Sequence, residues 1–173
     1  MDIGFEHGFF DVQITPCDPT ANGMDMIEFG FAPNAGEDMR PLRMIASSGE
    51  ISRVMLATKA VLAKQDQIPV LVFDEIDANI GGEIGGAVGR KLAQVARHHQ
   101  LLCITHLPQV AACGDRHLAV SKKVEDGRTY TEVELLDPET RAEEIARMLG
   151  GKDSTNVTLQ HAKEMLEQTT MSL

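Results

Sequence analysis

The stretch Val70-Leu71-Val72-Phe73-Asp74-Glu75 decides the fold that the sequence predicts. Four consecutive apolar residues are typical of a strand that is buried on both faces, as in a parallel sheet. Two acidic residues follow at once, at the carboxyl end of the strand, where open α/β sheets place their ligands. Such a pair can hold Mg²⁺ through water and orient a water molecule for attack on a phosphate. Because four apolar residues before two acids are also a common structural pattern, neighbouring features have to decide between these interpretations.

A second strand follows the first along the chain. Gly81 and Gly82 form a turn before an amphipathic helix, and the apolar run 101–105 comes after it. The order strand, helix, strand predicts two parallel strands with a right-handed crossover. His106 stands directly after the second strand, and neighbouring strands lie about 5 Å apart. A lone histidine there is more often structural than catalytic, but this one could approach the same phosphate as Glu75.

A helix start lies upstream of the acidic pair. Residues 51–62 carry apolar side chains at three- and four-residue spacing, which predicts an amphipathic helix that ends before Pro69. Ser47-Ser48-Gly49-Glu50 precede it. The unpaired amides and partial positive charge of a helix start can bind an anion. The alternative is an ordinary helix cap made by Ser47.

The flanking segments predict two antiparallel strand pairs and two helices in a single domain. The strands are expected at 9–14 and 26–31 around a turn at 15–23, and at 117–124 and 128–135 around Asp126-Gly127; the helices are expected at 140–149 and 155–167. The predicted division within 1–173 is N-terminal strands and linker (1–45), core (46–113), and hairpin with C-terminal helices (114–173).

Composition narrows the class of protein. The 173 residues contain 16 Lys and Arg against 26 Asp and Glu, a net charge of −10. This charge disfavours a large nucleic-acid footprint on the chain itself, since phosphate contacts need clustered cations. Three cysteines without Cys-x-x-Cys spacing suit a reducing compartment. With neither a signal peptide nor a membrane span in the sequence, the prediction is a cytoplasmic protein without membrane contact.

The chain resembles the second half of an ABC-type ATPase head in the order of four features: the helix start, the acidic pair after the first strand, the glycine turn and the histidine after the second strand. Their counterparts there are the signature motif, Walker B, the D-loop and the switch histidine. The local context is similar to the RecN family of SMC-like repair ATPases. The resemblance covers nearly the whole chain and is carried by Ser48-Gly49-Glu50-Ile51-Ser52-Arg53-Val54-Met55-Leu56-Ala57, Phe73-Asp74-Glu75-Ile76-Asp77, Ile80-Gly81-Gly82, Thr105-His106-Leu107-Pro108-Gln109-Val110-Ala111 and Ala146-Arg147-Met148-Leu149-Gly150-Gly151.

The resemblance implies an α/β fold, the C-terminal half of an ABC/SMC-type head with a parallel βαβ core, flanking helices and a β-hairpin. It implies ATP and Mg²⁺ as cofactors. Asp74 would hold the magnesium through water, Glu75 would be the catalytic base and His106 the γ-phosphate sensor. Asp77 and Gly81, in the D-loop region, would also contact the nucleotide. The signature residues would contact ATP bound to the opposite head: Ser47, Ser48, Gly49 and Glu50.

Three positions depart from the patterns of the wider class. The usual signature has glycine where this chain has Ser48, and a large apolar residue where it has Ala46. Glycine tolerates a closer phosphate approach than serine. Many SMC heads also have aspartate at the position of Gly81, although glycine is normal for the RecN branch.

The sequence has no Gly-x-x-x-x-Gly-Lys-[Ser/Thr]. Without that loop there is no amide nest or lysine for the β- and γ-phosphates. The resemblance therefore implies two partners, an N-terminal Walker A lobe of the same protein and a second head in a head-to-tail dimer, with negligible hydrolysis by the chain alone. DNA double-strand breaks would be reached through the full-length protein, at the nucleoid.

Two alternatives belong to other classes. A non-catalytic head-pairing module would explain the missing loop and Ser48. An unrelated α/β domain would instead use Asp74, Glu75 and Asp77 as a metal-binding cluster, and would bind divalent metal tightly without nucleotide.

Overall fold

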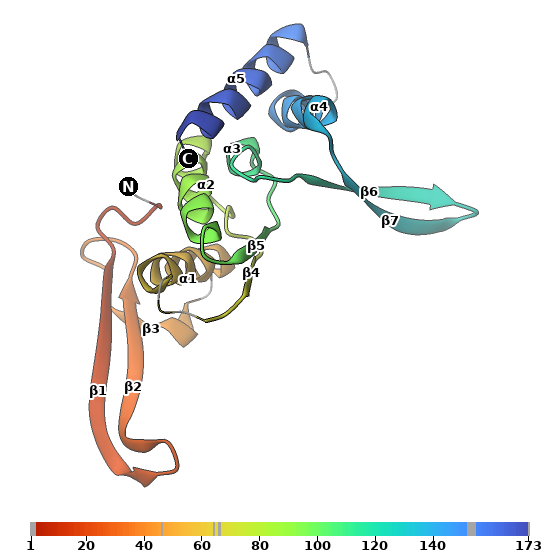
Figure 1. Ribbon diagram of the computed structural model, residues 1–173. Helices are drawn as coiled ribbons and strands as arrows, with labels where there is room; N and C mark the ends of the chain where they lie inside the picture. The colour runs from red at the N-terminus through yellow and green to blue at the C-terminus, as the bar shows by residue number, and fades with distance from the viewer. Residues whose placement is uncertain (1–2, 46, 64, 66, 152–154, 173) are drawn as a thin grey trace.

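The computed structural model describes residues 3–45, 47–63, 65, 67–151 and 155–172 (Figure 1). Ala46, one of the departures from the usual signature, lies outside them. The elements in chain order are β1 (Phe9–Thr20), β2 (Gly23–Ala32), β3 (Arg40–Pro41), η1 (Leu42–Met44), α1 (Ser48–Leu62), β4 (Val70–Phe73), α2 (Gly82–Ala96), β5 (Gln100–Cys103), α3 (Pro108–Ala111), β6 (Leu118–Glu125), β7 (Arg128–Leu135), α4 (Pro138–Gly150) and α5 (Asn156–Ser172).

The centre of the fold is the predicted βαβ unit. β4 and β5 pair in parallel, with Leu71 opposite Leu101 and Phe73 opposite Cys103, and α2 connects them. The main core lies between these strands and the helices α1 and α2. Its innermost side chains are fully buried: Leu56, Ile76, Val88 and Val95. The prediction of an α/β fold with a parallel βαβ core is confirmed.

The prediction that both faces of the sheet are buried is wrong for this chain. Leu71 and Phe73 point into the core, but Val72 on the opposite face is 63% exposed. On β5 and just beyond it, Leu102 and Ile104 are also exposed, at 46% and 62%. The second face carries apolar side chains that the described residues do not cover.

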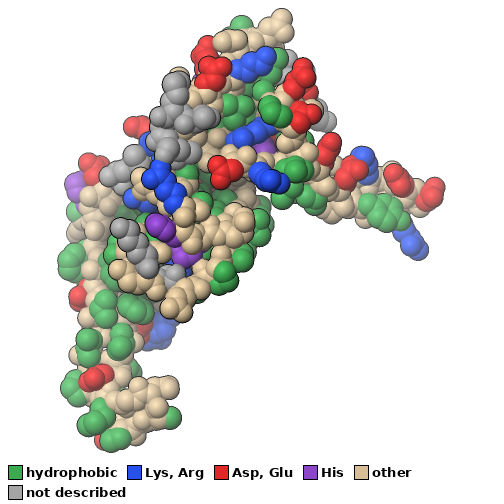
Figure 2. Space-filling model, viewed as in Figure 1, with side chains coloured by type: hydrophobic (Ala, Val, Ile, Leu, Met, Phe, Trp, Pro, Cys, Tyr) green, Lys and Arg blue, Asp and Glu red, His purple; other side chains and the backbone are tan. Residues whose placement is uncertain are grey.

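Two hairpins project from this centre (Figure 1). In the first, the strands continue through most of the predicted turn, so that Thr20 already pairs with Gly23. The register shifts between Pro16 and Thr20, and β1 tolerates proline because an edge strand leaves many N–H groups unpaired. Hydrophobic side chains are exposed along this arm (Figure 2). The second hairpin, β6–β7, turns at Asp126-Gly127 as predicted, and both turn residues have positive φ.

The C-terminal helices form a second, smaller core. Ile145, Ala146 and Ala162 are almost completely buried where α4 packs against α5. Arg141 on α4 ties this unit to the end of α3 by donating to the carbonyl oxygen of Ala112 at 3.1 Å. Within the described part of the chain, no helix is long and apolar enough to cross a membrane.

Candidate functional site

The acidic pair lies where the sequence predicts it, immediately after β4. Asp74 and Glu75 are both exposed at the carboxyl end of the strand. The chain then turns tightly, since the amide of Ala78 donates to the carbonyl of Glu75 at 3.0 Å. Glu75 has a φ of 55°, a conformation that non-glycine residues seldom adopt. Such outliers persist where the surrounding structure holds them, and they cluster at functional sites.

Asp77 joins this turn to the segment after β5. Its side chain is 2% exposed, and Oδ2 accepts hydrogen bonds from Thr105 Oγ1 (2.5 Å), the His106 amide (2.9 Å) and the Leu107 amide (3.1 Å). Burial by itself raises the pKa of Asp77, but these hydrogen bonds and the nearby His106 outweigh it and hold the pKa below its ordinary value. The carboxylate is therefore a fixed link between the ends of the two parallel strands.

His106 is oriented by that link. Its Nδ1 lies 3.1 Å from Asp77 Oδ2, while 71% of the side chain remains exposed. The close carboxylate holds one side of the ring, and the exposed remainder of the ring stays available at the same end of the sheet as Asp74 and Glu75.

The start of α1 approaches the acidic pair from the side. Ser47 caps the helix by accepting from the Glu50 amide at 3.3 Å, so the ordinary-cap interpretation is correct for its hydroxyl in this structure. Ser48 is exposed, and its hydroxyl donates to Oε2 of Glu75. One turn later, the Ser52 hydroxyl donates to the carbonyl oxygen of Asp74 at 3.0 Å.

Gly49 explains how the helix comes so close. The residue is buried, and a Cβ there would lie 3.0 Å from both Cβ and the carbonyl oxygen of Ala78 and 3.1 Å from the carbonyl oxygen of Glu75. Glycine lets α1 rest directly on the turn after β4, and a larger residue would have to push the turn away by a few tenths of an ångström. The structure gives this glycine a packing role within the chain, and its contact with ATP on another head stays a prediction.

Arg53 is the residue that the sequence analysis missed. It is 5% exposed, and Nη1 donates to the carbonyl oxygens of Ile76 (3.3 Å) and Ala78 (3.2 Å). Its guanidinium also lies 5.1 Å from the ring centre of Phe5. Burial lowers the pKa of Arg53, while Glu50 acts in the opposite direction. The available signal was its spacing from Gly49 at i+4, which puts both residues on the helix face that meets the turn.

Gly81 and Gly82 begin α2. Gly81 is its N-cap, and no atom of the described residues lies within 4 Å of a Cβ built there, so packing against them does not require glycine. Gly82 does have a close neighbour, because a Cβ would lie 2.6 Å from Nε2 of Gln109. The assignment of Gly81 to the nucleotide site stays a prediction.

The structure argues against the metal-cluster alternative. Among the described residues, no three His, Cys, Asp or Glu side chains come together in a group that could hold a metal ion. Asp77 is buried and engaged with the 105–107 segment, whereas Asp74 and Glu75 are exposed. Asp74 alone still fits a magnesium–nucleotide site, because Mg²⁺ keeps several waters and uses one or two carboxylates together with substrate phosphates.

The sequence of this chain is similar to those of bacterial DNA repair proteins. No family model matches the chain. The chain is 42% identical to the DNA repair protein RecN of Bacillus subtilis over 153 residues (88% of the chain), and 43% identical to RecN of Deinococcus radiodurans over 166 residues (95% of the chain). The chain belongs to the RecN family. It spans only 27% and 29% of those two relatives, about a quarter of their length.

Solved structures agree with the family at the level of the fold. An Smc head domain with coiled coil and joint from Pyrococcus yayanosii matches 97% of this chain and 27% of its own, with a TM-score of 0.60 and 21% identity. A Pyrococcus furiosus Smc head with an extended coiled coil, bound to the C-terminal domain of ScpA, matches 84% of this chain and 34% of its own, with a TM-score of 0.56 and 22% identity. This chain therefore has half of an SMC-type head fold.

Proposed function

We propose that this chain supplies the C-terminal lobe of an SMC-like ATPase head that acts in DNA repair. The observation that carries the proposal is the link through Asp77, which places Asp74, Glu75 and His106 at one end of two adjacent parallel strands. An acidic pair and an oriented histidine at that end can hold Mg²⁺, orient the attacking water and contact the γ-phosphate, which are three of the tasks in phosphoryl transfer to water. The relatives contribute the biological context, since they are DNA repair proteins by name.

Each side chain then has a defined task. Asp74 is the exposed carboxylate for Mg²⁺, which would offset charge on the phosphate oxygens when bound with ATP. Glu75 orients the attacking water and accepts its proton, and His106 contacts the γ-phosphate through its exposed ring. Asp77 and Gly81 shape the D-loop around that site. The start of α1 (Ser47, Ser48, Gly49 and Glu50) serves the ATP held by the opposite head.

The uncovered face of the β4–β5 sheet supports an N-terminal lobe as partner. Val70, Val72, Leu102 and Ile104 are between 46% and 63% exposed there. Apolar surface of this kind is stabilised by burial against another part of a protein. A lobe with the missing phosphate loop, packed on this face, would complete the site at its edge. Paired heads, arranged head to tail, would then bring each helix start to the other head's ATP.

In this proposal, parts of the full-length protein outside this chain make the contacts with DNA. The chain has a net charge of −10. It spans 27% and 29% of its two relatives, which are therefore about three to four times longer than the matched part. Contacts with phosphates require cations that this acidic lobe does not concentrate. The complete protein would bring the head to DNA at the nucleoid, in the cytoplasm.

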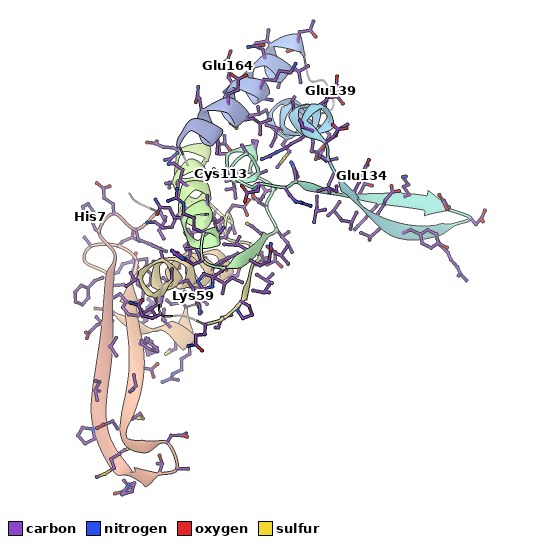
Figure 3. The ribbon with its side chains drawn as sticks, in the orientation of Figure 1. His7, Lys59, Cys113, Glu134, Glu139 and Glu164 are labelled. Carbon is purple, nitrogen blue, oxygen red and sulfur yellow. The ribbon has the colours of Figure 1, made fainter. Side chains whose placement is uncertain are left out.

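The proposal is tested by Glu75→Gln in a protein that contains both lobes. The amide cannot accept the proton of the attacking water, so we expect the rate of ATP hydrolysis to fall by about 100-fold or more. The Kd for a fluorescent ATP analogue should remain within about threefold of that of the unsubstituted protein, because the substitution removes an interaction of the transition state and not one of the bound ground state. Glu134→Gln is the matched control, since Glu134 lies on the exposed β6–β7 arm (Figure 3). Hydrolysis at the original rate by the Glu75→Gln protein would contradict the proposed base.

A further inference from the structure

The contact between Ser48 and Glu75 connects two parts of the site that the proposed function assigns to different ATP molecules. Ser48 is the first residue of α1, and its hydroxyl donates to Oε2 of Glu75 within the same chain. The approach is imposed by the backbone, because Gly49 lets α1 rest against the carbonyl oxygens of Glu75 and Ala78. Arg53 holds the same helix to the same turn through the carbonyl oxygens of Ile76 and Ala78.

The two partners of this contact have different tasks in the proposed function. Glu75 activates water at the ATP held by its own head, whereas the start of α1, to which Ser48 belongs, serves the ATP held by the opposite head. A serine hydroxyl has one proton to donate. It can therefore donate to the Glu75 carboxylate or to the partner's phosphate, but not to both at once.

We propose that Ser48 is a positioning residue that couples the two composite ATP sites. While the opposite head carries no ATP, the Ser48 hydroxyl holds the Glu75 carboxylate at the start of α1. When the opposite head presents its γ-phosphate, the hydroxyl turns to it and releases Glu75 to its own site. A head pair with a single ATP is then slow, and a pair with two ATP molecules is active. This inference rests on the proposed function, and it gives a role to Ser48, which stands where the usual signature has glycine.

Steady-state ATP hydrolysis by the protein with both lobes tests this coupling. We expect a sigmoidal dependence of the rate on ATP concentration. Ser48→Ala should make it hyperbolic and raise the rate at low ATP about fivefold, a coupling at the lower end of the range for interacting sites. Ser48→Thr keeps the hydroxyl and should keep the sigmoidal curve. Ser52→Ala is the matched control, because it removes a hydroxyl one turn further along α1 that contacts a backbone carbonyl and not Glu75.

A change of the half-saturating ATP concentration alone, with the sigmoidal shape kept in Ser48→Ala, would overturn the coupling and leave the proposed function intact. The absence of hydrolysis in the unsubstituted two-lobe protein would overturn both. A second measurement needs no hydrolysis: the carboxyl ¹³C NMR signal of Glu75 in the 173-residue chain should move in Ser48→Ala and stay in place in Ser52→Ala. An unmoved signal in Ser48→Ala would also overturn the coupling.

Discussion

The two faces of the β4–β5 sheet carry the same kind of side chain in different surroundings. On the inner face, Leu71 and Phe73 pack against α1 and α2, and each is less than a tenth exposed. On the outer face, Val72 and Ile104 are 63% and 62% exposed. The inner face explains how this chain holds the acidic pair in place, and the outer face is the surface on which the proposed N-terminal lobe would pack. An apolar sequence thus does not reveal which of its side chains are buried within the chain, and the structure does.

Adjacent substitutions on β4 should separate the two faces most strongly. Phe73→Ala removes a side chain that is 4% exposed, and we expect it to lower the free energy of unfolding by about 3–5 kcal/mol. Val72→Ala, one residue earlier on the opposite face, should change it by less than about 1 kcal/mol. Urea denaturation followed by circular dichroism measures both. Equal losses for the two variants would mean that the outer face is covered within this chain.

The link through Asp77 should account for the next largest effect. Asp77→Ala leaves the Thr105 hydroxyl and two amides without their acceptor, which should cost about 2–3 kcal/mol of unfolding free energy. The folded pKa of Asp77 is below the ordinary 3.8, so its charge stabilises the fold fully above that value. This contribution is lost as the pH falls from 3.8 through the folded pKa.

Asp77→Asn isolates the charge from the shape of the side chain. Urea denaturation at pH 6 and pH 3 should show that the stability difference between the chain and Asp77→Asn shrinks at the lower pH. A difference that grows on acidification would show that the folded carboxylate is destabilised, contrary to its hydrogen bonds.

The close approach of α1 to the turn after β4 should have a smaller effect. Gly49→Ala places a methyl group 3.0 Å from backbone and Cβ atoms of Ala78, and we expect a loss of about 1–2 kcal/mol. Gly86→Ala on α2 is the matched control, because among the described residues its Cβ would meet only the flexible end of Arg90, at 3.4 Å. Alanine is the better helix former, so the control should gain up to about 1 kcal/mol. Thermal unfolding of both variants decides the point, and a stabilised Gly49→Ala variant would exclude the packing role.

The rates of thiol alkylation compare the centre of the fold, at Cys103, with the projecting β1–β2 arm, at Cys17, and they require no substitution. Burial, aided by the nearby Asp77 and Asp74, raises the pKa of Cys103 to about 12. Cys17 is exposed on β1. With iodoacetamide at pH 8, Cys17 should react faster than Cys103 by about two orders of magnitude, since only the thiolate is the nucleophile. Timed mass spectrometry gives the rates, and the urea-unfolded chain is the control in which both thiols react. Similar rates in the folded chain would show that the end of β5 is open.

Much of the fold was predictable from local patterns. The period of residues 51–62 predicted α1, Asp126-Gly127 predicted the β6–β7 turn, and the apolar run before Asp74 predicted β4. The proline-containing part of β1 reads as a turn in the sequence, because proline lacks the N–H group that a central strand needs. In the structure this part is a strand, because β1 lies at the edge of its sheet, and its position there cannot be predicted from local sequence. The exposure of Val72 was missed because side-chain character does not reveal which neighbours belong to the same chain.

The candidate site was predictable in its residues but not in its connections. Asp74, Glu75 and His106 were found from their places after two strands, and the structure brings these ends together. The links made by Asp77, Arg53 and the Ser48 hydroxyl depend on side-chain directions: Asp77 joins the turn after β4 to the segment after β5, and the other two join α1 to that turn. Such contacts are set by tertiary packing, which sequence spacing alone does not contain.

ATP hydrolysis by the purified chain, with and without a separately purified N-terminal Walker A lobe, tests the central claim most directly. The account predicts no hydrolysis by the chain alone, hydrolysis when the two lobes are mixed, and loss of that hydrolysis when the chain carries Glu75→Gln. Turnover by the chain alone would contradict the claim that it is half of a head. Association of the lobes without hydrolysis would contradict the catalytic assignment and favour a head-pairing module.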